Sequence, residues 1–358
     1  MGLQPRWLHR SEGLPILCSG TARASEAPWS GDVKISLGIY PNETPADIIA
    51  SAKLADGMGY STLWVLDSHL LFHEVYTLLG ALAVSTTRIR LGTAVTNPLT
   101  RHPTVTAAAF STLAELSGGR ASLGISVGDS ALKSMNLGAA KMSVLAETVA
   151  LCRTLLAGES VSFGEGKTAQ LHHVGPEVPI YLAATGPKML ELAGRIADGV
   201  ILMNGIAPEL IREAVRIVGE GERAANRQKG CVKIAVWAAC HPSLHAVKFN
   251  VARAILRNIP GEIDDRTRQV AESVKRAYDF RQHGSAEAEF ARLIPDEIVT
   301  RFAFSGEYAE IACQVRALEP CGIDEVVLAV PVAPKITSRD VIMRELSQMI
   351  VSVGAGRS

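Results

Sequence analysis

The sequence predicts an α/β fold, a (β/α)8 TIM barrel with a helical insertion before the last strand. Two observations lead to this prediction. From residue 33 onward, short apolar runs rich in β-branched residues alternate with longer helical patterns, which is typical of βα units around a parallel sheet. The apolar runs number eight, as a closed barrel of this kind requires.

The predicted strands and helices follow from these patterns in order. The strands are expected at residues 34–40, 62–66, 89–95, 121–127, 180–184, 199–203, 232–239 and 325–330. Thr44, Pro45 and Asp47 resemble an N-cap, a first-turn proline and a capping acid, and glycines at 57 and 59 end the helix that they begin. Further helices are expected at residues 74–85, 104–116, 141–156, 187–197, 208–226 and 338–351.

One connection is longer than a usual crossover. Residues 244–320, between the last two strands, have a helical and amphipathic pattern. We expect a final crossover helix at residues 306–318, preceded by an insertion that covers one end of the barrel. Residues 1–32 follow neither hydrophobic period, so we expect a flexible N-terminal extension there and one barrel domain over residues 33–358.

Composition favours a protein that acts on small molecules. The 36 basic residues are balanced by 36 acidic ones, so no positive field exists for nucleic acid or an anionic membrane. No apolar run reaches the roughly 18 to 20 residues that span a bilayer. The six cysteines lie far apart without metal-site spacing, which indicates reduced thiols in a cytoplasmic protein and no metal.

Residues at the strand ends are the candidates for chemistry, because active sites of such barrels lie at the carboxyl ends of the strands. The second strand is followed by Asp67 and His69. One interpretation is that Asp67 or His69 contacts a cofactor or substrate, or that His69 handles a proton. The other is that Asp67 caps the next helix and His69 is a solvated loop residue.

The third strand runs through Ala94 and Val95 into Thr96 and Asn97. Small and polar residues there suit close backbone approach to a flat ring and hydrogen bonds to the polar edge of the ring. A proline-containing turn into the next helix is the alternative interpretation.

The fourth strand ends in Val127, Gly128 and Asp129. Gly128 allows the backbone to approach a ligand, and Asp129 presents a carboxylate at the mouth. That carboxylate is a candidate to bind a ring N–H, or to donate a proton if burial raises its pKa. A helix N-cap is the alternative.

The fifth strand leads into Thr185, Gly186 and Pro187 at the start of a helix. Free N–H groups and the positive end of the helix dipole form a candidate phosphate site, although many βα turns contain Gly-Pro for geometry alone. The phosphate loop G-x-x-x-x-G-K-[ST] and the fingerprint G-x-G-x-x-G are absent, which argues against ATP and ordinary dinucleotides.

These segments together resemble the bacterial-luciferase-like superfamily, and most closely the coenzyme F420-dependent methylenetetrahydromethanopterin reductases. The resemblance rests on five stretches spread over nearly the whole chain, which begin at residues 40, 91, 116, 124 and 184 and read YPNE, LGTAVTNP followed by RHP, LSGGR, GISVGD and ATGP.

The resemblance implies a barrel with a tricyclic cofactor across its mouth. It implies a non-proline cis peptide between Ala94 and Val95 behind the ring, an active-site acid at Asp129, a cofactor-contacting acid at Asp67, and a phosphate-bearing tail at Thr185 and Gly186. The residues expected to bind the cofactor are Asp67, Ala94, Val95, Thr96, Asn97, Val127, Gly128, Thr185, Gly186 and Pro187.

Two departures from the reductases lie close to the expected ring and substrate. Gly38 stands where they carry an acidic residue in the first strand, and Ser68 separates Asp67 from His69. The cofactor site is therefore expected to survive these changes, and the pterin substrate is not.

The resemblance predicts an oxidoreductase that transfers a hydride between coenzyme F420, a deazaflavin, and a small organic substrate. Asp129 is the first choice for the proton, and His69 is the second. The alternatives are an FMN-dependent luciferase-like monooxygenase and a non-catalytic flavin-binding protein of the same superfamily. The expected assembly is a homodimer.

Overall fold

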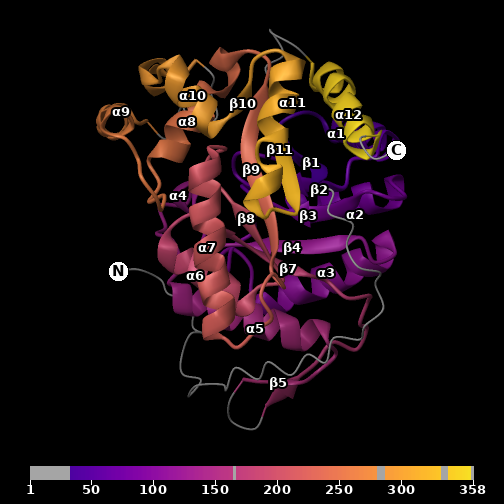
Figure 1. Ribbon diagram of the computed structural model, residues 1–358. Helices are drawn as coiled ribbons and strands as arrows, with labels where there is room; N and C mark the ends of the chain where they lie inside the picture. Colours follow the sequence, from indigo (N-terminus) through magenta and orange to yellow (C-terminus); the bar gives the residue numbers. More distant parts are fainter. Residues whose placement is uncertain (1–32, 164–166, 280–286, 332–337, 356–358) are drawn as a thin grey trace.

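Eight parallel strands close into a barrel in the computed structural model, which describes residues 33–163, 167–279, 287–331 and 338–355 (Figure 1). Each barrel strand pairs with the next one along the chain, and β11 pairs back with β1. The barrel strands are β1 (Lys34–Ile39), β2 (Thr62–Val65), β3 (Arg90–Thr93), β4 (Ala121–Ile125), β7 (Ile180–Ala184), β8 (Gly199–Leu202), β9 (Lys233–His241) and β11 (Glu325–Val330). The predicted (β/α)8 barrel is confirmed.

Helices surround the barrel at the places where the apolar periods predict them. They are α1 (Pro45–Met58), α2 (Val75–Ser85), α3 (Pro103–Ser117), α5 (Met142–Leu156), α6 (Pro187–Ile196), α7 (Pro208–Ala224), α11 (Tyr308–Arg316) and α12 (Arg339–Ala355). The Thr44 hydroxyl accepts a hydrogen bond from the Asp47 amide, and Gly59 ends α1 with a φ of 84°. Thr44 and Gly59 therefore act as the predicted caps, whereas Gly57 lies inside α1 and the Asp47 carboxylate accepts a hydrogen bond from the Thr44 hydroxyl.

The predicted insertion between β9 and β11 is present and mainly helical. It contains α8 (Leu244–Ile255), α9 (Asp265–Ala277), η3 (Glu289–Leu293), α10 (Asp296–Phe302) and the short strand β10 (Phe304–Ser305), and η4 (Glu319–Cys321) follows α11. Figure 1 shows α8, α9 and α10 gathered at one end of the barrel. Since α8 starts directly after the carboxyl end of β9, the insertion covers the end of the barrel where the candidate residues lie.

Three apolar clusters hold these layers together. The largest lies between the strands and the surrounding helices, and a second one packs the insertion around Val247, Phe290 and Ile298. The third fills the barrel interior and includes Trp64 and Trp237. The described part of this long connection therefore packs on its own apolar cluster, outside the barrel interior.

The predictions were incomplete at short elements. The hairpin of β5 (Val161–Ser162) and β6 (Thr168–Ala169), the strand β10 and the one-turn helix α4 (Ser130–Lys133) were not predicted, because such short segments show no hydrophobic period. The third strand was predicted too long, since β3 ends at Thr93 where the backbone forms a bulge. The strand predicted at 232–239 extends to His241 because β10 pairs with its last two residues.

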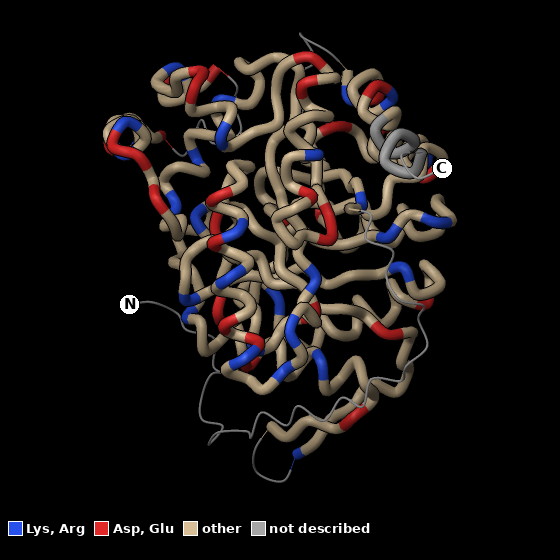
Figure 2. Tube along the Cα trace, in the orientation of Figure 1, with Lys and Arg blue, Asp and Glu red and all other residues tan. Residues whose placement is uncertain are grey.

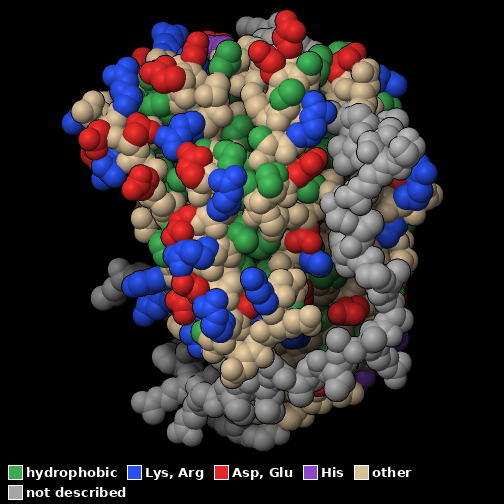
Figure 3. Space-filling view, viewed as in Figure 1, with side chains coloured by type: hydrophobic (Ala, Val, Ile, Leu, Met, Phe, Trp, Pro, Cys, Tyr) green, Lys and Arg blue, Asp and Glu red, His purple; other side chains and the backbone are tan. Residues whose placement is uncertain are grey.

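Other sequence-based expectations concern the N-terminal extension, membrane spans, cysteines and surface charge. The extension at residues 1–32 lies outside the described residues. Within the described part of the chain, no helix combines the length and apolar character needed to cross a membrane, and the five cysteines there are free thiols. Figure 2 shows acidic and basic residues interspersed along the chain, and Figure 3 shows their side chains interspersed on the face in view, as the balanced composition predicts.

Candidate active site

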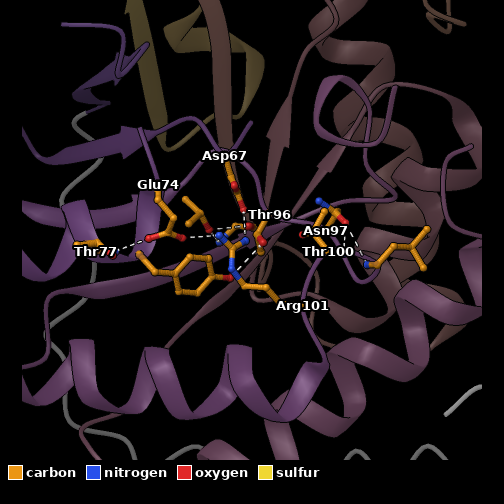
Figure 4. A network of polar contacts seen from close by, with 11 residues as sticks. Asp67, Glu74, Thr77, Thr96, Asn97, Thr100 and Arg101 are labelled. Carbon is orange, nitrogen blue, oxygen red and sulfur yellow. Dashed lines mark hydrogen bonds and ion pairs between the residues drawn. The ribbon is translucent and has the colours of Figure 1, made fainter. Parts of the chain in front are cut away.

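Asp67 lies at the carboxyl end of β2 and forms a buried ion pair. Its side chain is 1% exposed, and its Oδ2 atom lies 2.8 Å from Nη1 of Arg101. The same guanidinium binds Glu74 through Nη2 and lies over the ring of Tyr76, 4.0 Å from the ring centroid. Figure 4 shows Arg101 between the two carboxylates. Asp67 does not cap the following helix, because Glu74 accepts the amide of Thr77 there.

Two opposing effects act on the pKa of Asp67: its burial and the charge of Arg101. Burial raises the pKa of the Asp67 carboxyl above its ordinary value, and the charge of Arg101 opposes that rise. The Thr96 hydroxyl lies close enough to act on the Asp67 carboxyl and opposes the rise of its pKa, but the buried Oδ1 atom accepts no hydrogen bond of good geometry from the described residues. An acceptor in this state is available to a ligand N–H group.

The third strand ends in a backbone bulge directly beside this ion pair. The Ala94-Val95 peptide bond is cis, as the resemblance predicted. The Ala94 amide donates to the carbonyl of Val65, and the Thr96 amide donates to that of Gly124. The hydroxyl of Tyr76 donates to that of Thr96 over 3.1 Å. The Asp67–Arg101 network is thus tied to the bulge through Tyr76.

The alternative interpretation of this segment as a turn is also correct for one residue. The Oδ1 atom of Asn97 accepts the amides of Leu99 and Thr100, each over 3.0 Å, so this side chain stabilises the turn into α3. Asn97 is buried. The side chain therefore has a structural role whether or not it also contacts a ligand.

Gly124 explains why the bulge can pack so closely against β4. A Cβ atom at this position would lie 1.9 Å from the carbonyl oxygen of Thr93, and 3.1 Å from the side chain of Val95. The Thr93 hydroxyl also donates to the Gly124 carbonyl over 2.7 Å. Only glycine leaves room for this backbone-to-backbone contact.

Asp129 lies at the mouth, but its surroundings differ from the predicted ones. Its side chain is 48% exposed and pairs with Lys133 over 2.5 Å. It occupies the N-cap position of α4 without making a side-chain capping bond. Although burial acts to raise its pKa, the hydrogen bond and charge of Lys133 and the charges of Arg257 and Arg253 lower it overall. The condition under which Asp129 would be a ready proton donor, a pKa raised by burial, is therefore not met, because these three cations were not foreseen from the sequence.

Two further residues of the predicted site are Gly128, after the fourth strand, and His69, after the second strand. Gly128 has a φ of 89°, and a Cβ there would lie 2.4 Å from Cδ1 of Leu132, so backbone conformation and packing account for this glycine without a ligand. His69 is half-buried in the loop after β2, and its ring makes no hydrogen bond to another described residue.

The loop after β7 leads into α6 as predicted. Gly186 is the N-cap of α6 and has no side chain to satisfy the first amides, and Pro187 follows it. The carbonyl of Thr185 accepts from Nδ2 of Asn204, at the end of β8, over 3.0 Å. The Oδ1 atom of Asn204 is buried and unpartnered among the described residues. This end of α6 therefore presents the positive end of a helix dipole, while Pro187 has no N–H and the Met189 amide already donates to the carbonyl of Gly186.

The insertion contributes mouth residues that sequence reasoning missed. The hydroxyl of Tyr40, after β1, donates to Oδ1 of Asn250 on α8 over 2.8 Å. Nearby on the same face are Arg253 and Arg257, whose charges act on both Asp129 and Tyr40. The helical period of this segment predicted its secondary structure, but no sequence pattern indicated which barrel end these side chains would face.

The departure at Gly38 has a structural explanation. A Cβ at this position would lie 2.4 Å from the indole of Trp237. Trp237 on β9 is 8% exposed and belongs to the apolar cluster inside the barrel. An acidic side chain at position 38 would clash with this indole. The Trp237 ring therefore occupies the space that such a carboxylate would need.

An eight-stranded barrel with polar side chains gathered at the carboxyl ends of its strands is typical of an enzyme that acts on small molecules. The family described as luciferase-like monooxygenase matches residues 27–325, and the chain belongs to this family.

Relatives with named activities match the chain over most of its length. The 5,10-methylenetetrahydromethanopterin reductase of Methanolobus tindarius is 31% identical over 308 residues, which cover 82% of this chain and 93% of the relative. The enzyme of the same name from Archaeoglobus fulgidus is 28% identical and covers 84% and 95%. An F420-dependent glucose-6-phosphate dehydrogenase of Beutenbergia cavernae is 36% identical over a shorter stretch, 51% of this chain and 60% of the relative.

Solved structures share the fold. The coenzyme F420-dependent tetrahydromethanopterin reductase of Methanopyrus kandleri superimposes with a TM-score of 0.75 at 23% identity, covering 90% of this chain and 99% of that one. A monooxygenase of Streptomyces bottropensis superimposes with a TM-score of 0.63 at 18% identity, covering 90% and 100%.

Proposed function

We propose that the protein is an oxidoreductase that transfers a hydride between coenzyme F420 and a small organic substrate. The observation that carries this proposal is the similarity to a reductase over 93% of the length of that relative. The dehydrogenase relative and the reductase of known structure are both named as F420-dependent enzymes.

The mouth offers acceptors to a ligand that carries hydrogen-bond donors on a polar ring edge. Two buried acceptors, Oδ1 of Asp67 and Oδ1 of Asn204, accept no hydrogen bond of good geometry from the described residues. A buried polar atom left unpaired costs about 1 to 3 kcal/mol, so a ligand that satisfies such atoms is favoured. In the proposal, Asp67 and the segment from Ala94 to Asn97 hold the ring beside Val127 and Gly128. Thr185, Gly186 and Pro187 hold the tail.

The chain supplies orientation and proton transfer. When bound, a deazaflavin supplies a centre that accepts or donates a hydride. Asp129 is ionised at neutral pH because its pKa is lowered by Lys133 and two arginines. It is therefore ready to accept a proton when the substrate is oxidised, and it donates one only after taking a proton from solvent. His69 is the second candidate for this proton.

An FMN-dependent monooxygenase is the alternative, since the family description names monooxygenases and the fold is shared with one. A second alternative is a flavin-binding protein without turnover. The ion pair of Asp67 and the half-exposed carboxylate of Asp129 favour an enzyme over a passive binder.

Reconstitution separates the F420-dependent enzyme from the FMN-dependent monooxygenase. The full chain is incubated with F420 or with FMN, passed over a size-exclusion column and examined by visible absorption. We expect the deazaflavin band to elute with the protein, and the reduced complex to persist in air because deazaflavins react poorly with oxygen. Retention of FMN alone, with rapid reoxidation in air, would favour the monooxygenase. Retention of neither cofactor would contradict both.

The assembly and location are part of the same proposal. A cytoplasmic homodimer is consistent with the free thiols of the described residues and with the exposed apolar side chains of Val105, Leu116 and Phe163. Light scattering on the same column gives the mass, and a monomer would contradict the dimer.

A further inference from the structure

Two arginines of the insertion lack partners in the part of the chain that is described. Arg253 lies on α8, and Arg257 follows shortly after the end of that helix. Both are half-buried, and neither guanidinium forms an ion pair or donates a hydrogen bond to another described residue. Other buried or partly buried arginines have partners: Arg101 pairs with Asp67, Arg339 pairs with Glu43, and Arg120 donates to backbone carbonyls. By contrast, neither insertion arginine has a direct hydrogen-bonded partner among the described residues, although the charge of Asp129 acts on Arg257.

Contacts at both ends of this segment fix it over the barrel mouth. Asn250 precedes Arg253 by one helical turn and accepts the hydroxyl of Tyr40 at the end of β1. Asn258 directly follows Arg257, and its carbonyl oxygen lies 3.4 Å from the place that a Cβ would take at Gly186. The arginines consequently lie between the end of β1 and the start of α6, on the side of the mouth that includes Asp129.

The charges in this region do not balance. Asp129 is already paired with Lys133. Arg253 and burial both lower the pKa of Arg257, because two like charges are held close together in a poorly solvated place. The Nδ2 atom of Asn250 is a further buried donor without a partner among the described residues. Two cations and a free amide donor facing one region require an acceptor that carries negative charge.

A pocket adjoins Lys133, the ion-pair partner of Asp129. This open pocket of about 360 Å³ is lined by Lys133, Asn136, Leu137 and Gly138. Guanidinium groups bind carboxylate and phosphate oxygens in pairs, and their planar geometry makes them more selective for such groups than lysine.

We propose that Asn250, Arg253 and Arg257 form an anion-binding site over the barrel mouth that takes a phosphate or carboxylate group. This inference rests on the proposed function, whose substrate it assigns to the class of anionic organic molecules. The phosphate-bearing tail of the cofactor is the other possible source of the same anion. The two sources are distinguished by whether the anion and the cofactor bind together.

The test is calorimetric titration of the full chain with inorganic phosphate at constant ionic strength. We expect saturable binding to the wild type and at least about tenfold weaker binding to Arg253→Gln and to Arg257→Gln, since each loses a charge-assisted contact. Lys275→Gln, which removes an exposed charge from α9 of the same insertion, is the matched control and should bind like the wild type. Equal phosphate affinity in wild type and Arg257→Gln, or no saturable binding by the wild type, would overturn the site.

Two further measurements address a variant that fails to fold and the source of the bound anion. If Arg257→Gln does not fold, as judged by thermal unfolding, Arg257→Lys retains the charge but loses the paired donors, and it should still bind phosphate more weakly than the wild type. Equal affinity in Arg257→Lys counts against the site. Phosphate binding to F420-loaded protein assigns the anion to the substrate, whereas competition between phosphate and F420 assigns it to the cofactor tail. F420 binding is recorded separately by absorbance, so failure of the cofactor proposal remains distinguishable from failure of the site.

Discussion

Asp129→Asn is expected to slow turnover by about 100-fold to 10,000-fold, the usual loss when a general acid or base is removed. The amide keeps the size of the carboxylate and much of its hydrogen bonding, but it cannot exchange a proton. Gly38 and the indole of Trp237 leave no first-strand carboxylate to replace it. Cofactor affinity should change far less than the rate. The measurement is the turnover rate and the F420 affinity of both proteins with one substrate.

A matched control separates proton transfer from loss of an ion pair. Asp265→Asn removes an exposed carboxylate that pairs with Arg268 within α9, much as Asp129 pairs with Lys133 around α4. We expect this control to retain the wild-type rate. If Asp129→Asn also retains it, Asp129 serves only as an ion-pair partner or ligand contact, and His69 becomes the leading candidate for the proton.

Arg101→Leu is expected to destabilise the fold by about 3 to 5 kcal/mol, because it leaves the carboxylate of Asp67 buried without its cation. The Asp67 side chain is 1% exposed, so water cannot take the place of the guanidinium. The change also removes the cation over the ring of Tyr76, whose hydroxyl contacts Thr96 in the bulge. Chemical denaturation gives the free energy of unfolding, and a weaker affinity for F420 should accompany the loss.

The chain offers an exposed counterpart for this variant. Arg216 also lies between two carboxylates, those of Glu213 and Glu220, but on the surface of α7. Arg216→Leu should leave the unfolding transition nearly unchanged, because exposed ion pairs contribute little to stability. A similarly small change in the free energy of unfolding for Arg101→Leu would mean that the Asp67–Arg101 ion pair contributes little to the stability of the fold.

The barrel could be predicted from sequence because its strands and helices are specified locally. Each strand is a short buried run and each helix has its own period and caps, so the order of elements gives the topology. The last residues of β9 were missed because their partner strand, β10, is two residues long and comes from the insertion. The local pattern does not contain that information.

The site was predictable only in part, since its electrostatics depend on residues far apart in the chain. Asp67 and Arg101 are separated by 34 positions, and no pattern in either segment indicated that they would pair. The pKa of Asp129 depends on Arg253 and Arg257, which the insertion brings over the mouth. The bulge at Ala94 and Val95 was predicted by resemblance to a family, not by local propensity.

Competitive titration of the purified full chain with F420 and FMN tests the central claim most directly. The account predicts tighter binding of F420, since the polar mouth and the start of α6 are proposed to hold its ring and tail. Affinities are read from absorbance or fluorescence of each cofactor under identical buffer conditions. If FMN binds at least tenfold more strongly, a difference of about 1.4 kcal/mol, the deazaflavin assignment is contradicted and the monooxygenase alternative replaces it.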